Sequence, residues 1–208
     1  MKDTQIINLL KKKIFNLNRS LAGSDNLKTL KFIKKIIPDL KLKSFKSSKK
    51  IFDWRSPKVW SVKDAYVEDE KKVKIIDIKN NFLHVLNYSS RINKFVSKKE
   101  LFKNLYFIKT MPKAIPYVTS YYFRKWGFCV KYNELNKFKS DRYKVVVDSK
   151  FSRNNIPYAE YLIKGKSKKE IIFSTYICHP NLANDNFSGI VINTLIANYL
   201  RKKKKTLL

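Results

Sequence analysis

The hydrophobic pattern of this chain changes twice along its length, and this limits the folds that it can adopt. In residues 3–17 and 27–37, apolar residues recur every three or four positions, as in amphipathic helices. From residue 51, short aromatic and β-branched runs alternate with Asp, Asn, Ser and Pro, which is typical of strands and turns. Strand-like runs return at residue 143, and 187–205 again has a helical pattern. The sequence therefore predicts an α/β protein that is interrupted by a β-rich segment.

The two changes in pattern define three expected segments. We expect residues 1–50 and 143–208 to pack together and residues 52–140 to form a separate β-rich unit. The local predictions are strands near 65–68, 73–78, 82–88, 143–149 and 158–165, a short helix over 97–108 and a polar connection over 41–50.

The run "IIFSTYI" at residues 171–177 is nearly all apolar, as expected for a central strand that is covered on both faces. A polar loop and the last predicted helix follow it. This order places the loop at the carboxyl edge of a sheet, where open α/β sheets bind their ligands. The loop "CHPNLANDNFSG" is therefore the candidate functional site.

His179 and Asp185 of this loop have the chemistry of metal ligands. Imidazole nitrogen and carboxylate oxygen both bind Zn²⁺, at about 2.0–2.2 Å, and Asp185 could instead bridge two metal ions. Gly189 would allow a close approach at the start of the helix. The alternative is an ordinary Asn-rich loop with no ligand. A complete zinc site needs three or four protein ligands, and the other histidine, His84, is far away in the sequence.

The charge of the chain is strongly positive. The net charge is +30, from 46 Lys and Arg against 16 Asp and Glu, which could indicate a polyanionic partner. Nearly all these residues are lysines spread along the chain, however, and Arg, which supplies bidentate contacts to nucleic acid, is scarce. We therefore expect a compositional bias and no specific nucleic-acid partner.

Cysteines and apolar windows indicate the compartment. Cys129 and Cys178 have no metal-ligand spacing, so free thiols in a reducing compartment are the simpler interpretation, although a disulfide is the alternative. The first residues lack the apolar run of about seven residues that a secretory signal needs. No window approaches the ~20 apolar residues of a membrane span. The sequence predicts a cytoplasmic protein with no membrane span.

Several motifs together resemble a known family. "STYICHPNLANDNFSG" closely resembles the first metal-binding stretch of bacterial proteins with an aminopeptidase-like domain, which are associated with polysaccharide biosynthesis and belong to the zinc exopeptidase group. "NRSLAGSDNLKTLKFIKKIIP", "FDWRSPKVWSVKDAYV", "LHVLNYS", "IPYVTSYYFRKWGFC" and "VVVDS" resemble the N-terminal half of the same proteins, in the same order. The resemblance covers roughly residues 15–200.

The resemblance implies a fold and a set of site residues. The fold would be an αβα zinc-exopeptidase domain, truncated here, with a small β domain inserted at about residues 52–140. His179 matches a metal-ligand histidine, and Asp185 matches the carboxylate that bridges two zinc ions. Asn181 stands where zinc exopeptidases have an Asp that orients the histidine, and an amide would accept the same hydrogen bond without contributing charge.

The family's general-base glutamate, its remaining metal ligands and its last histidine lie further along than residue 208. We therefore expect this chain to be the N-terminal portion of an aminopeptidase-like zinc-dependent hydrolase, acting on a peptide or aminoacyl-type small substrate and inactive by itself. A missing C-terminal half is then the expected partner. One alternative is a non-catalytic sugar- or peptide-binding protein with a vestigial metal loop. Another, which rests on charge alone, is a nucleic-acid-binding protein.

Overall fold

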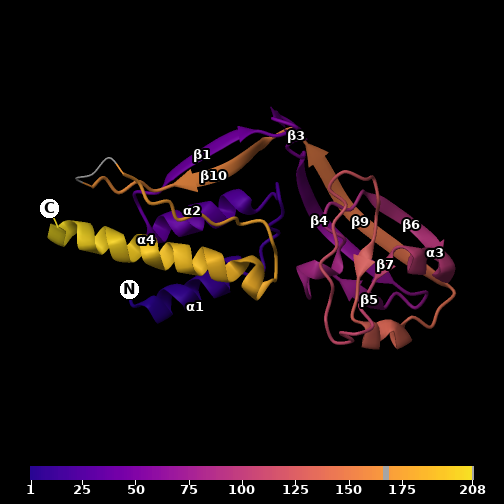
Figure 1. The fold of residues 1–208 in the computed structure, drawn as a ribbon. Helices are drawn as coiled ribbons and strands as arrows, with labels where there is room; N and C mark the ends of the chain where they lie inside the picture. Colours follow the sequence, from indigo (N-terminus) through magenta and orange to yellow (C-terminus); the bar gives the residue numbers. More distant parts are fainter. Residues whose placement is uncertain (166–168, 208) are drawn as a thin grey trace. The chain divides into compact units, whose positions relative to one another are not determined.

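The computed structural model describes residues 1–165 and 169–207, which form two compact units. The first unit combines residues 1–59 with residues from 153 onward, and the second consists of residues 60–152 (Figure 1). Each unit has its own strands, helices and buried residues. The fold is mixed α/β with several small sheets, as the sequence predicts at this level.

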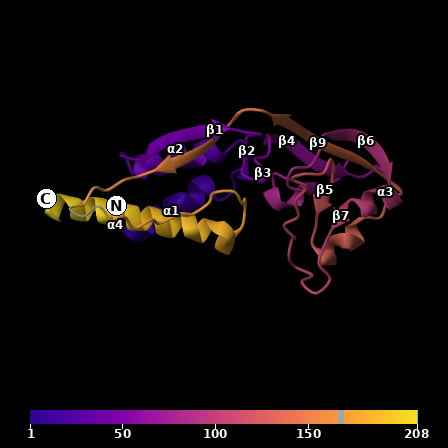
Figure 2. The same ribbon diagram turned by 45° about the horizontal axis from the view of Figure 1, so that its top comes forward.

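Three helices form the core of the first unit: α1 (Asp3–Ile14), α2 (Asn26–Ile36) and α4 (Ser188–Leu207). They lie side by side in both Figures 1 and 2. Their apolar positions, spaced by three or four residues, face one another. The buried set is Ile6, Leu10, Ile14, Ile33, Ile36, Ile190 and Val191. Each such side chain contributes about 1.5–3 kcal/mol on burial, and the three helical predictions are confirmed.

Two pairs of antiparallel strands complete the first unit. β1 (Lys41–Lys46) pairs with β10 (Asn155–Glu160), and β2 (Lys50–Ile51) pairs with β3 (Trp54–Arg55). The polar connection predicted over residues 41–50 is therefore wrong. Lys43 of β1 hydrogen-bonds Glu160 of β10, 117 positions later. No local sequence pattern indicates a pairing partner at that distance.

The second unit is built on a four-stranded sheet in the order β5-β4-β9-β6. The strands are β4 (Val59–Glu68), β5 (Lys74–Asp77), β6 (Ile92–Ser97) and β9 (Arg142–Ser152). Along β9, Tyr143, Val145 and Val147 are fully buried at every second position, the period of a strand with one covered face. The strand predictions near 65–68, 73–78 and 143–149 are confirmed.

Smaller elements of the second unit differ from the sequence predictions. Residues 82–88 contain a 3₁₀ turn (Phe82–His84) instead of a strand, because the Asn81 side chain accepts the Leu83 amide hydrogen and starts the turn. Helix α3 (Lys98–Lys103) is shorter than predicted. The other elements are the parallel pair β7 (Leu105–Tyr106) and β8 (Phe128–Cys129) and a second 3₁₀ turn, Tyr132–Lys137.

The unit borders differ from the borders expected from pattern. The expected third segment, 143–208, begins with a strand that belongs to the second unit, because β9 pairs with β6 in its sheet. The second unit therefore ends at residue 152. Residues 166–168 and 208 of the expected segment lie outside the described residues. That the second unit is an insertion into an aminopeptidase-like domain stays a prediction.

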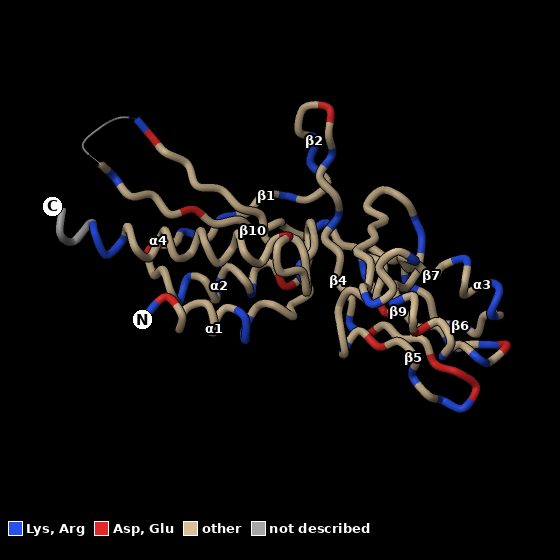
Figure 3. The backbone as a smooth tube through the Cα atoms, turned by 60° about the horizontal axis from the view of Figure 1, so that its bottom comes forward, with Lys and Arg blue, Asp and Glu red and all other residues tan. Residues whose placement is uncertain are grey.

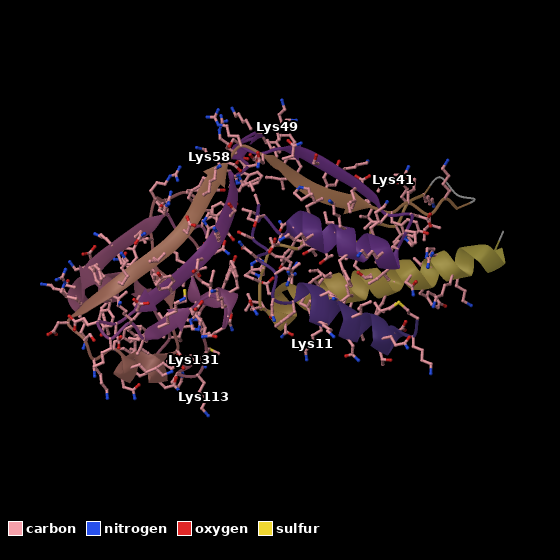
Figure 4. The ribbon with its side chains drawn as sticks, turned by 180° about the vertical axis from the view of Figure 1, so that it is seen from behind. Lys11, Lys41, Lys49, Lys58, Lys113 and Lys131 are labelled. Atoms are coloured by element: carbon pink, nitrogen blue, oxygen red, sulfur yellow. The ribbon has the colours of Figure 1, made fainter. Side chains whose placement is uncertain are left out.

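The positive charge is distributed over both units. Figure 3 shows Lys and Arg on helices, strands and loops of each unit, and the lysines labelled in Figure 4 come from α1, β1 and several loops. This agrees with the spread of lysines along the sequence. Among the described residues, no helix is both long and apolar enough to cross a membrane.

Candidate metal-binding loop

An exposed apolar segment precedes the loop. No strand forms in the described residues 169–179, and Ile171, Ile172 and Phe173 are 85%, 81% and 54% exposed. The central strand predicted over residues 171–177 is therefore wrong for the described chain, and so is the position of the loop at a sheet edge. A buried strand needs neighbouring strands for its backbone groups and cover for both faces. Among the described residues no strand pairs with this segment, and only its end, at Ile177, packs against the helical core.

The far end of the loop is attached firmly to the helical core. A turn over Ala183–Phe187 leads directly into α4. The ring of Phe187 packs edge-on against Phe15, with centroids 5.3 Å apart. A Cβ atom at Gly189 would lie 2.6 Å from the Thr175 hydroxyl oxygen, so any larger residue would have to displace the Thr175 side chain. The close approach predicted for Gly189 is confirmed.

The two predicted ligands lie next to each other. His179 Nε2 is 3.8 Å from Asp185 Oδ2, with the His179 side chain 15% exposed and that of Asp185 56% exposed. The Tyr176 hydroxyl donates a 2.6 Å hydrogen bond to Asp185 Oδ1, and the Tyr176 and His179 rings lie 5.5 Å apart. One carboxylate oxygen is thus held by the tyrosine, while the other faces the imidazole.

The surroundings of His179 favour its neutral form. Burial lowers the pKa of His179 below its usual 6.5, the nearby Arg19 lowers it further and Asp185 raises it. His179 Nδ1 is 3.3 Å from Cys178 Sγ. Either ring nitrogen can carry the proton of the neutral imidazole, since the Cys178 thiol can donate to Nδ1 or accept from it. Metal binding through Nε2 requires the tautomer with the proton on Nδ1.

Asn181 fastens the loop to the end of α1. Its backbone amide donates to the Phe15 carbonyl at 3.2 Å, and its side-chain amide donates to Asn16 Oδ1 at 2.7 Å. Its φ of 52° is in the left-handed region, which Asn tolerates better than most residues. Asn181 therefore positions the loop as a whole, and its predicted role in orienting the His179 ring stays a prediction.

The residues present fit part of a zinc site. A nitrogen and an oxygen 3.8 Å apart can reach one ion at about 2.0–2.2 Å each after a small closing movement. Within the described ranges, no group of three or more His, Cys, Asp or Glu side chains could hold a metal ion. Two protein ligands leave most of the coordination sphere to other groups.

Three residues near the loop had no role assigned from the sequence: Tyr176, Cys178 and Arg19. Tyr176 contacts Asp185 from nine positions away in a segment without regular periodicity, so no spacing rule could find it. Burial raises the pKa of Cys178 to about 11, so its thiol is protonated and it stays free. Arg19 is fully buried, and its signal in the sequence was only the motif "NRSLAGSDN".

Known proteins match both the sequence and the structure. Residues 59–150 match the family described as Domain of unknown function (DUF2172). A relative from Clostridium acetobutylicum is 42% identical over 200 residues, covering 96% of this chain and 46% of the relative, and is named for polysaccharide biosynthesis and an aminopeptidase-like domain. A crystal structure from Clostridium acetobutylicum, described as that of a peptidase, has a TM-score of 0.91 and 42% identity, covering 96% of this chain and 47% of that chain.

These matches show that the chain is similar in sequence and in its mixed α/β fold to part of a structure described as that of a peptidase. More closely, the chain is related to the bacterial proteins with an aminopeptidase-like domain that are named for polysaccharide biosynthesis, which confirms the resemblance seen in its motifs. The chain spans about half the length of the relatives that it matches.

Proposed function

We propose that this chain forms part of an aminopeptidase-like zinc hydrolase in which His179 and Asp185 are metal ligands. The observation that supports this most strongly is the convergence of the two side chains, 3.8 Å apart, on the loop that precedes α4. The names of the two relatives support the reaction class. The substrate class we propose is a peptide or an aminoacyl compound with a scissile amide.

Each residue of the loop has a defined part in this proposal. His179 would supply a neutral nitrogen, and Tyr176 would hold the Asp185 carboxylate in one orientation through its 2.6 Å hydrogen bond. Asn181 would keep the loop against α1. Bound zinc would supply an activated water and a Lewis acid for the amide carbonyl. The general base and the other ligands would come from a C-terminal half.

The 208-residue chain alone should therefore bind Zn²⁺ weakly and hydrolyse no aminoacyl substrate. Two protein ligands give far less affinity than the four of a structural site. We also propose a cytoplasmic location, in keeping with the two free thiols, and no specific nucleic-acid partner, since the lysines are dispersed over both units.

Calorimetric zinc titration of matched variants tests the proposal. His179→Ala and Asp185→Asn should each abolish binding, whereas Asp53→Asn, a change of an exposed carboxylate in the same unit, should leave it unchanged. Thermal melting of each variant checks that the fold is retained. Zinc binding that survives both loop substitutions would refute the ligand assignment. Robust hydrolysis of an aminoacyl p-nitroanilide by this chain would refute its dependence on a second half.

A sugar- or peptide-binding second unit remains the alternative, favoured by one observation. Tyr122 and Phe123 are 63% and 69% exposed, and exposed apolar side chains that lie together mark interaction surfaces and ligand-binding grooves. In contrast, Trp60 and Tyr88 are buried and stacked with centroids 5.7 Å apart, which is packing. Loss of oligosaccharide or peptide binding in a Tyr122→Ala, Phe123→Ala double variant would support this function.

A further inference from the structure

Arg19 is a buried cation without a protein acceptor. Its side chain is 0% exposed, and Nε, Nη1 and Nη2 have no hydrogen-bond partner among the described residues. Buried charges in native proteins are almost always paired, because removing them from water without a partner is costly. The Arg19 guanidinium therefore has all its donors free for an acceptor from outside the described residues.

Hydrogen bonds fix the backbone on both sides of Arg19. The Asn18 amide hydrogen-bonds the Asp25 carboxylate at 3.1 Å, and the Asn26 side chain donates to the Ser20 carbonyl at 2.8 Å. These contacts close a compact loop on both sides of Arg19 before α2 begins. The side chain is therefore presented by a rigid part of the fold, as binding residues usually are.

Two further side chains in this part of the first unit also lack partners. Asn18 and Asn186 are 5% and 3% exposed, and the side-chain oxygen and nitrogen of both have no partner among the described residues. Asn18 precedes Arg19, and Asn186 follows Asp185. The segments that contain them pack together through the rings of Phe15 and Phe187.

The chemistry of these groups indicates the kind of ligand. A guanidinium binds a carboxylate through two parallel hydrogen bonds. A single buried cation is neutralised by a monoanion, whereas a phosphate dianion would leave one buried negative charge uncompensated. The two asparagine amides offer acceptors as well as donors, so they suit a ligand that also has N–H groups. A free amino acid or the end of a short peptide has all of these groups.

We propose that Arg19, with Asn18 and Asn186, binds the carboxylate end of a short peptide or a free amino acid beside the His179–Asp185 loop. The inference rests on the proposed peptidase function, for which it names the substrate class: short substrates with a free carboxylate. Binding of the carboxylate itself requires no metal ion. Since the guanidinium is fully covered, entry requires a local opening, and association should be slow.

Calorimetry and thermal melting of the metal-free 208-residue chain test this inference. The ligands are glycylglycine and glycylglycinamide, which lacks the free carboxylate, at about 0.15 M salt to screen the net positive charge. Glycylglycine should bind with a stoichiometry of one and raise the melting temperature, and glycylglycinamide should do neither. Arg19→Met should weaken glycylglycine binding about tenfold or more, the loss of a charge-assisted bidentate contact.

Two variants make the result decisive. Arg19→Lys keeps the positive charge but loses the two parallel N–H donors of the guanidinium. It should therefore bind glycylglycine more weakly than wild type and more tightly than Arg19→Met. Arg153→Met removes an exposed arginine of the same unit and should bind like wild type. Equal binding of the two ligands, no binding of either, or unchanged binding in Arg19→Met would overturn the inference. If the chain binds glycylglycine but does not bind zinc, the assignment of His179 and Asp185 as metal ligands is rejected and the inference about Arg19 stands.

Discussion

The hydrogen-bonded polar groups around Trp60 and His84 in the second unit contrast with the Arg19 guanidinium in the first unit. In the second unit, the Ser89 carbonyl accepts hydrogen bonds from Trp60 Nε1 at 3.0 Å and from the Ser149 hydroxyl at 2.8 Å. His84 Nδ1 lies 2.8 Å from the Cys129 carbonyl. In the first unit, the Arg19 guanidinium has no acceptor among the described residues. Hydrogen-bonded buried groups help to specify a fold, whereas a buried cation with no acceptor needs an explanation of its own.

The largest loss of stability should come from a substitution at Trp60, in the region where the buried polar groups are hydrogen-bonded. Trp60→Ala would remove a fully buried ring and should lower the free energy of unfolding by about 3–5 kcal/mol. Trp60→Phe should cost only about 1 kcal/mol, because Ser149 still donates to the Ser89 carbonyl. Urea denaturation measures both. Equal losses in the two variants would mean that the hydrogen bond, and not the packing, dominates this region.

An intermediate effect should come from the loop that presents Arg19. A Cβ atom at Gly23 would lie 2.5 Å from the Ser20 backbone nitrogen and 2.8 Å from the Asn18 carbonyl oxygen. Gly23→Ala should therefore lower the free energy of unfolding by about 1–3 kcal/mol. The control is Gly165→Ala, where a Cβ would meet nothing within 4 Å. If the two variants melt at the same temperature, the loop is not the rigid support that this account requires.

The smallest effect should be a dependence of stability on pH that both units share. Burial lowers the pKa of His84 and of His179 below 6.5. The unfolded chain then takes up protons before the folded chain does, so the free energy of unfolding should fall as the pH drops below about 6.5. His84→Gln should reduce that slope. Denaturation at pH 7.5, 6.5 and 5.5 measures it, and a slope that is the same in the variant would contradict the shift.

The sequence predicted the helices well because their signals are local. The spacing of Ile6, Leu10 and Ile14 alone indicates the buried face of α1. β1 was missed because its hydrogen bonds come from β10, more than a hundred residues later. The run at 171–177 was predicted as a buried strand from its composition, but strand formation depends on neighbours that the described chain does not give it.

In the candidate site, too, local signals could be read from the sequence, whereas contacts between distant segments could not. His179 and Asp185 could be selected from the sequence because ligand chemistry and loop position are both visible there. Tyr176 and Arg19 could not, because their roles depend on contacts between segments that are far apart in the chain. The hydroxyl of Tyr176 meets Asp185 across the loop, and Arg19 lies near enough to His179 to lower its pKa.

The chain has only two histidines, so their side-chain nitrogen resonances test the central claim most directly. A ¹⁵N-labelled sample is titrated with Zn²⁺ at pH 7.5 and the four imidazole nitrogens are followed by NMR. The account predicts that the Nε2 resonance of His179 shifts on zinc addition. Both nitrogen resonances of His84 should not shift, because its ring is buried against the Cys129 carbonyl. A spectrum in which His179 is unchanged at saturating zinc, or in which only His84 responds, would contradict it.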